Sequence, residues 1–196
     1  MSKELKTELI ERCLVITFTR PEIRNPLSVT VLEQLHHILD GVAVDNGVDA
    51  VIFTGQDASF ASGADLREIA GVDAASAPAF ALRGQGLMNK VAELRQHTTA
   101  AVNGYCFGGA LDLALACSRR IASPDAKFAH PGAGLGIITG WGGTQRLPRL
   151  VGRGRALELF FTAEPVNADK ALSWGLIDEI ADEPVAAALK NKDNTL

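Results

Sequence analysis

The stretch that most constrains the fold is Ala101–Cys117, which reads AVNGYCFGGALDLALAC. A short apolar run ends at a turn signal, and Gly108-Gly109 then precede apolar residues at helical spacing, so the stretch predicts a strand, a tight loop and a helix. The first amides of a helix lack intrahelical acceptors, so this helix offers an N–H donor at Gly109, with Asp112 in its first turn. Such donors suit an oxygen that becomes negative during a reaction. Alternatively, the glycines allow close packing and Asp112 complements the helix dipole.

The rest of the chain alternates between short apolar runs and amphipathic segments. Ser28 and Asn167 stand where N-caps are expected, and the glycine-crowded segment His130–Gly143 predicts a loop packed close to other groups. The predicted strands are Leu5–Ile10, Cys13–Thr19, Ala50–Thr54, Ala100–Val102, Ile121–Ala122, Lys127–Ala129 and Leu176–Ile180. The predicted helices are Val29–Ala43, Ala79–Gln96, the helix after Gly109, Thr144–Val151, Gly154–Phe161 and Ala168–Trp174. This alternation indicates the α/β class.

Composition bounds the possible classes of protein. A length of 196 residues fits a single domain, and the net charge of −4 with a pI of about 5.6 argues against a nucleic-acid partner. The three cysteines show no CxxC spacing, and His36 and His37 have no nearby partner for a metal site. No apolar run reaches membrane-spanning length and the N-terminus lacks a signal-peptide core, so we expect a cytoplasmic protein without a membrane span or bound metal.

Several familiar catalytic and nucleotide motifs are absent. The run Gly132–Gly140 departs from G-x-G-x-x-G at its last glycine and follows no clear strand, so a dinucleotide site is rejected. The chain has no GxxxxGK[ST] motif, and no histidine pairs with Ser59 or Ser62 by a local signature. What remains is two glycine-flanked segments, Ser59–Leu66 and Asn103–Leu113, whose backbone amides can converge on one carbonyl oxygen.

Taken together, these residues resemble the crotonase (enoyl-CoA hydratase/isomerase) superfamily, in matching order from about Leu5 to Ile180. The resemblance lies in Arg20-Pro21-x-x-x-Asn25-Pro26-Leu27, in Phe60-Ala61-Ser62-Gly63-Ala64-Asp65-Leu66, in Ala101-Val102-Asn103-Gly104-Tyr105-x-x-Gly108-Gly109, in Gly142-Gly143-Thr144-Gln145-Arg146-Leu147 and in Ala168-x-x-Ala171-x-x-Trp174-Gly175-Leu176-Ile177-Asp178. It implies a ββα spiral in one acyl-CoA-binding domain, residues 1–181, followed by a short tail, residues 182–196.

The resemblance also implies roles for individual residues. The thioester oxygen would accept hydrogen bonds from the backbone N–H groups of Ala64 and Gly109. Arg24 would lie near the CoA phosphates, unless it is an ordinary solvated loop arginine. The implied substrate-binding set is Arg24, Ser62, Asp65, Leu66, Gly108 and Gly132, with the Ser62–Leu66 loop at the adenine end. Coenzyme A is carried by the substrate, so no separate cofactor is expected.

Two departures from the family pattern bear on activity. Hydratases of the family use two glutamates; the first falls at Asp112 and the second at Gly132, which has no side chain to hold a proton. His130 stands two positions away and is either a second catalytic group or a hydrogen-bonded wall residue. If the rest of the site is hydratase-like, Gly132→Glu should raise hydration. The second departure is length, because typical members continue through a further C-terminal helical region that is mostly missing here.

Two functions follow from these observations. The first is an enoyl-CoA hydratase/isomerase-type enzyme of fatty acid metabolism, in which Ala64 and Gly109 stabilise an enolate and Asp112 is the single acid/base. The second is an acyl-CoA-binding protein with little or no catalysis. Large apolar residues after Gly143, namely Leu157, Phe160, Phe161 and Trp174, further predict a homo-oligomer, a trimer or hexamer.

Overall fold

The main body of the protein is a six-stranded sheet, described in a computed structural model for residues 4–190. Its order is β1-β2-β4-β7-β9-β12; β1 and β2 are antiparallel, and every other neighbouring pair is parallel. Glu11 and Arg12 join the hairpin with φ angles of 45° and 69°, which match the twist of two-residue hairpin turns. The strands are β1 (Leu5–Ile10), β2 (Cys13–Phe18), β4 (Ala50–Gly55), β7 (His97–Val102), β9 (Arg119–Ala122) and β12 (Glu179–Ile180).

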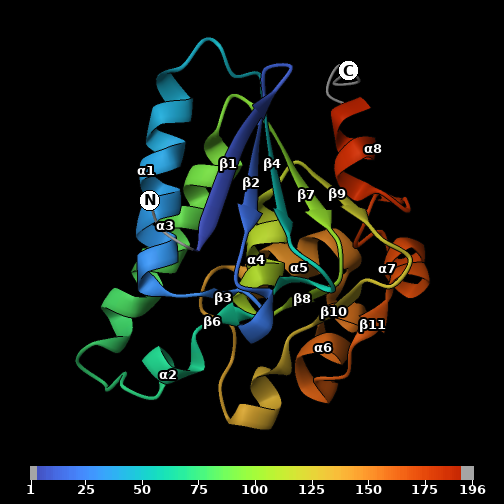
Figure 1. Ribbon diagram of the computed structural model, residues 1–196. Coiled ribbons are helices and arrows are strands. Elements are labelled where there is room, and N and C mark those ends of the chain that lie inside the picture. Colours follow the sequence, from blue (N-terminus) through green and yellow to red (C-terminus); the bar gives the residue numbers. More distant parts are fainter. Residues whose placement is uncertain (1–3, 191–196) are drawn as a thin grey trace.

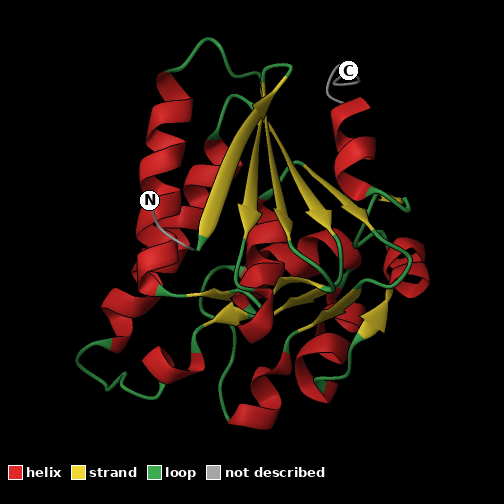
Figure 2. Ribbon diagram, viewed as in Figure 1, coloured by secondary structure: helices red, strands yellow, loops and turns green. Residues whose placement is uncertain are grey.

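Two smaller sheets lie across one end of the large sheet (Figure 2). The four-stranded sheet has the order β11-β10-β8-β5, and β3 pairs with β6. Their bounds are β5 (Ser59–Ala61), β8 (Tyr105–Phe107), β10 (Lys127–Ala129), β11 (Val166–Asn167), β3 (Pro26–Leu27) and β6 (Gly63–Ala64). The chain alternates between the large and the small sheets, so β4, β7 and β9 are followed by β5, β8 and β10. This arrangement is the predicted spiral.

Helices cover the large sheet and fill the space between the sheets (Figure 1). Helices α1 and α3 pack together, and every residue of α4 is buried. Their bounds are α1 (Val29–Val44), α2 (Leu66–Ile69), α3 (Ala77–Glu93), α4 (Gly109–Ala116), α5 (Gly143–Val151), α6 (Arg153–Thr162), α7 (Ala168–Trp174) and α8 (Pro184–Lys190). Two short 3-10 helices cover Pro21–Ile23 and Pro131–Leu135. Within residues 4–190, no helix is both long and apolar enough to cross a membrane.

Most predicted elements are confirmed, and side-chain caps explain the starts of α1 and α7. The Ser28 side chain accepts a hydrogen bond from the Val31 amide at the start of α1, and Asn167 accepts one from Lys170 at the start of α7. The predicted strand Leu176–Ile180 is mostly wrong, because only Glu179–Ile180 pairs with β9 while Leu176 and Ile177 pack into the core.

The segment from residue 182 onward was predicted as a short tail. Its described part contains α8, which packs on the face of the large sheet through Ala188. Ala188 belongs to a second apolar cluster with Cys13, Ala50, Ile52 and other sheet residues. Residues 191–196 of the predicted tail lie outside the described residues.

Candidate active site

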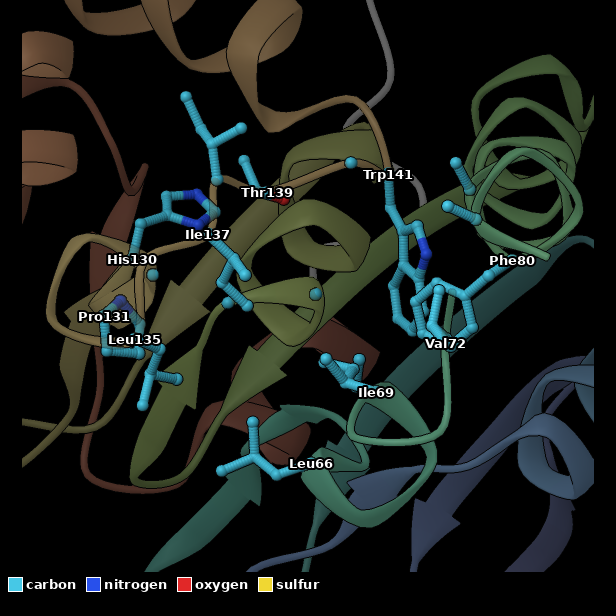
Figure 3. Close-up of a pocket in the computed structure, with 18 of the residues that line it drawn as sticks. Leu66, Ile69, Val72, Phe80, His130, Pro131, Leu135, Ile137, Thr139 and Trp141 are labelled. Carbon is cyan, nitrogen blue, oxygen red and sulfur yellow. The ribbon is translucent and has the colours of Figure 1, made fainter. Parts of the chain in front are cut away.

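An apolar pocket with a cavity volume of about 300 Å³ lies at the start of α4 (Figure 3). Its walls come from β6, α2 and the loop after α2, from α3, from the start of α4 and from the loop between β10 and α5. The lining residues are Ser62, Ala64, Leu66, Ile69, Val72, Ala77, Phe80, Ala81, Gly108, Gly109, His130, Pro131, Gly132, Leu135, Ile137, Ile138, Thr139, Gly140 and Trp141. A concave, mostly apolar site with a few polar groups is typical of small-molecule binding.

Ala64 and Gly109 line this pocket from two different elements. Gly109 is the first residue of α4, so its N–H has no intrahelical acceptor, and Ala64 ends β6. A Cβ built on Gly109 would lie 3.4 Å from the Ala64 nitrogen, and one built on Gly63 would lie 2.7 Å from the Gly109 nitrogen. The fold therefore brings together the two amides that the sequence singles out. Paired donors of this kind can stabilise an oxyanion.

Asp112 lies behind this pocket and does not line it. Its side chain is fully buried, its Oδ2 accepts a hydrogen bond from Thr139 Oγ1, and its Oδ1 is 3.5 Å from His130 Nε2. Burial raises the pKa of Asp112 to about 7, although hydrogen bonds from Thr139 and the Trp141 amide act to lower it. A carboxyl group with this pKa can take or release a proton near neutral pH.

His130 contacts both Asp112 and the pocket. It follows β10, its Nε2 is 3.5 Å from Asp112 Oδ1, and it is part of the pocket wall. The ring is 3% exposed, and within residues 4–190 neither ring nitrogen has a hydrogen-bond partner. Burial lowers the pKa of His130 to about 4, so the imidazole is neutral at pH 7. Between about pH 4 and pH 7, a single proton on the pair therefore resides on Asp112 rather than on His130.

Thr139 is a site residue that the sequence reasoning missed. Its hydroxyl donates to Asp112, and the residue also lines the pocket, so it connects the buried acid to the cavity. One feature of the sequence could have indicated this residue. Thr139 carries the hydroxyl group within the glycine-rich and apolar run His130–Gly143. When such a loop is buried against the rest of the protein, a polar side chain in it needs a hydrogen-bond partner.

The remaining predicted residues divide into two groups. Ser62, Leu66, Gly108 and Gly132 line the pocket together with Ala64, Gly109 and His130. Arg24 and Asp65 do not line it. The Arg24 guanidinium carbon lies 5.7 Å from the centre of the Tyr105 ring, and Arg24 itself has a left-handed φ of 63°. Asp65 caps α2, where it accepts from the Arg67 amide and forms an ion pair with the Arg67 side chain.

The surroundings of Gly132 explain why a side chain there is difficult. A Cβ at this position would lie 2.5 Å from the Ile137 carbonyl oxygen. The Ile137 amide also donates to the Gly132 carbonyl at 3.0 Å, which ties the two residues together. Gly132→Glu therefore requires the loop to move, so this substitution tests a rearrangement as well as the chemistry. Within residues 4–190, no group of three His, Cys, Asp or Glu side chains is arranged to hold a metal.

The comparisons with known proteins agree on one family. The chain matches the family model described as enoyl-CoA hydratase/isomerase over residues 9–191. It is 38% identical over 183 residues to the short-chain-enoyl-CoA hydratase of Clostridium acetobutylicum, covering 91% of this chain and 70% of that protein. It is 40% identical over 171 residues to the crotonyl-CoA hydratase of Syntrophomonas wolfei, covering 87% of this chain and 66% of that protein.

A solved structure gives the same result. An enoyl-CoA hydratase from Bacillus anthracis superposes with a TM-score of 0.92 at 33% identity, covering 97% of this chain and 76% of that one. The chain thus spans about two thirds to three quarters of the length of these three proteins. With the spiral fold and the motif order, these matches show that the chain belongs to the enoyl-CoA hydratase/isomerase family of the crotonase superfamily.

Proposed function

We propose that this chain is an enoyl-CoA hydratase/isomerase-type enzyme that acts on acyl-CoA thioesters. The observation that carries the proposal is the meeting of the Ala64 and Gly109 amides in an apolar pocket beside a buried acid. A thioester oxygen placed at both amides gains negative charge when the α-carbon loses a proton or the β-carbon gains a nucleophile. Donors that bind the oxygen more strongly once it is charged lower the barrier more than they stabilise the bound substrate.

Asp112 is the proposed acid/base, and it acts through the groups that contact both it and the pocket. Its pKa of about 7 suits proton transfer in either direction at neutral pH. His130 Nε2 is 3.5 Å from Asp112 Oδ1, and the Thr139 hydroxyl is bonded to Oδ2. A proton exchanged with the substrate therefore passes by the imidazole or the hydroxyl. A one-base double-bond shift or a decarboxylation asks less of this site than hydration, since Gly132 supplies no second carboxylate.

The alternative function is an acyl-CoA-binding protein with little or no catalysis. It is favoured by the complete burial of Asp112 and by the glycine at position 132, which leave the pocket wall with few groups that exchange protons. The two functions share the thioester site and differ only in the use of Asp112. In both, coenzyme A arrives with the substrate and no further cofactor takes part.

We also propose that the protein forms a homo-oligomer, either a trimer or a hexamer. Leu157 and Phe161 on α6 are 51% and 76% exposed, which supports an interface there. Phe160 and Trp174, which the sequence placed in the same set, are partly buried: Phe160 packs against His130, and Trp174 contacts Lys170. Light scattering at micromolar concentration tests this, and a stable monomer would contradict it.

One assay panel separates the two functions. Binding of butyryl-CoA is measured by calorimetry, and turnover is followed with crotonyl-CoA and with a β,γ-enoyl-CoA. An enzyme binds the thioester and converts at least one substrate, whereas the binding protein binds it without turnover. Failure to bind any acyl-CoA at millimolar concentration would overturn both.

A further inference from the structure

Trp141 closes one end of the apolar pocket. The side chain is 3% exposed, and its ring stands between α3 and α4, beside Phe80 (Figure 3). A Cβ on Gly84 of α3 would lie 2.2 Å from Trp141 Cδ1, and one on Gly109 of α4 would lie 2.4 Å from Cε3. Both helices thus carry a glycine where the indole packs against them, which fixes the ring in place.

A second cavity, of about 540 Å³, also has Trp141 in its lining. Thr139, Gly140 and Trp141 line both spaces. The other walls of this polar cavity are Gln85, Asn89, Gly142, Thr144, Gln145, Arg146 and Arg149. Trp141 is therefore part of a partition between an apolar space and a polar one.

The position of the two amides decides which part of a thioester meets this partition. Because the ring edge packs on Gly109, a thioester oxygen bound at Ala64 and Gly109 places its carbonyl carbon beside the indole. The CoA portion is large and charged, so it needs an open end of the pocket. Leu66 and Leu135 line the pocket away from Trp141 and are 57% and 52% exposed, so the opening lies on their side (Figure 3). The acyl chain is then directed toward the closed end.

We infer that Trp141 is a specificity-determining residue that limits the apolar pocket to short acyl groups. This inference rests on the proposed function and deepens it by naming the substrate class. A longer chain must displace the buried ring or push methylenes into the polar cavity, and neither is favourable. When an apolar site cannot accommodate even one additional methylene, the ratio of kcat/KM between the shorter and the longer substrate changes by about tenfold or more.

The test compares chain lengths in wild type and Trp141→Ala. Calorimetry measures the affinity for butyryl-CoA and decanoyl-CoA, and kcat/KM is measured for crotonyl-CoA and decenoyl-CoA. We expect wild type to favour the short chain by about tenfold or more, and the variant to gain about tenfold or more on the long chain. Trp174→Ala is the matched control, because it removes a tryptophan from α7, outside the pocket lining, and leaves the chain-length ratio unchanged.

Each outcome bears on a different statement. A folded Trp141→Ala protein with the wild-type ratio, or a wild type that already favours decanoyl-CoA, overturns the inference and leaves the proposed function standing. No binding of any acyl-CoA overturns the proposed function itself. If Trp141→Ala fails to fold, Trp141→Leu and Trp141→Phe replace it, and the long-chain affinity should rise as the side chain shrinks.

A spectroscopic measurement supports the same inference without turnover. The chain has two tryptophans, so Trp174→Phe leaves Trp141 as the single indole. Butyryl-CoA should change its fluorescence, whereas coenzyme A alone should not, because only the acyl group reaches the ring. Equal responses to the two ligands would contradict contact between the acyl group and Trp141.

Discussion

The two sides of the apolar pocket are built in different ways. On one side, β6 and the first turn of α4 fix the amides of Ala64 and Gly109, so only backbone geometry matters there. On the other side, Asp112, His130 and Thr139 meet because the loop after β10 packs over α4. Their chemistry depends on burial, which moves both pKa values. The first side is therefore sensitive to added atoms, and the second to changes in charge and solvation.

The largest effect is expected for Gly109→Ala on the backbone side. The new methyl would lie 2.4 Å from the Trp141 ring and 3.4 Å from the Ala64 nitrogen, so it intrudes on the space proposed for the thioester oxygen. We expect kcat/KM to fall by about 10²–10³, the usual value of one oxyanion donor. Because binding uses the same amides, the affinity for butyryl-CoA should fall too.

Gly134→Ala is the matched control, since a Cβ there meets nothing within 4 Å. It lies in the neighbouring loop and should leave both binding and turnover unchanged. Urea unfolding of both variants separates loss of the site from loss of the fold. A stable Gly109→Ala protein with wild-type affinity and turnover would show that these amides do not hold the thioester.

The next effect concerns the side-chain half. Asp112→Asn keeps the shape but removes the base, so turnover should fall by about 10², the usual contribution of a general acid/base, while butyryl-CoA still binds. His130→Ala should also lower turnover if the proton passes by the imidazole, because it removes a group that contacts both Asp112 and the pocket. Steady-state kinetics with calorimetry give both quantities for each variant.

The pattern of the two losses assigns the roles. A loss in His130→Ala alone would mean that Asp112 is not the acid/base. No loss of turnover in either variant would mean that neither residue is the acid/base. No measurable turnover in wild type or variants, with binding retained, favours the acyl-CoA-binding protein. The double variant should lose no more than the larger single loss, because the two residues act as one unit.

The backbone side of the site was largely predictable from the sequence. The strand, turn and glycine pair before Asp112 indicate a helix start, and α4 begins at Gly109. The caps at Ser28 and Asn167 likewise place α1 and α7 correctly. These features are local, so they depend on neighbouring residues in the chain and little on tertiary packing.

What was not predictable depends on distant contacts. The two- or three-residue strands β5, β6 and β8 are too short to show a periodicity, and they form because other strands pair with them. The burial of Asp112 is also non-local, because the loop carrying Thr139 covers it from 27 residues away. Chain order therefore indicated an acid near the helix start, but not its distance from the pocket.

The shifted pKa values also predict how stability depends on pH. Asp112 has its folded pKa raised from 3.8 to about 7, so its contribution to stability is lost as pH rises through that range. His130 has its folded pKa lowered from 6.5 to about 4, so its contribution is lost as pH falls through that range. In wild type, the two contributions to the free energy of unfolding therefore change in opposite directions with pH between about pH 4 and 6.5.

Single substitutions should reveal the pH dependence of stability that each group contributes. Over this window, Asp112→Asn should become more stable as pH rises and His130→Ala less stable, each by at most about 1.4 kcal/mol per pH unit. Urea unfolding at several pH values measures the free energy of unfolding of each variant. For wild type, this free energy should change little with pH over the same window. Parallel profiles for the two variants would mean that burial does not shift these groups in the stated directions.

The smallest effect is expected for Thr139→Val, which tests how the two halves are connected. The Thr139 hydroxyl donates to the Asp112 carboxylate and lowers its pKa, so its removal should raise that pKa above about 7. If turnover needs the ionised acid, the midpoint of the pH–rate profile moves to higher pH, while the limiting rate changes by less than about tenfold. Thr139→Ser keeps the hydroxyl and should restore the wild-type midpoint. Unchanged midpoints in all three proteins would place Asp112 outside the rate-determining step, and the pocket would then act through its backbone amides alone.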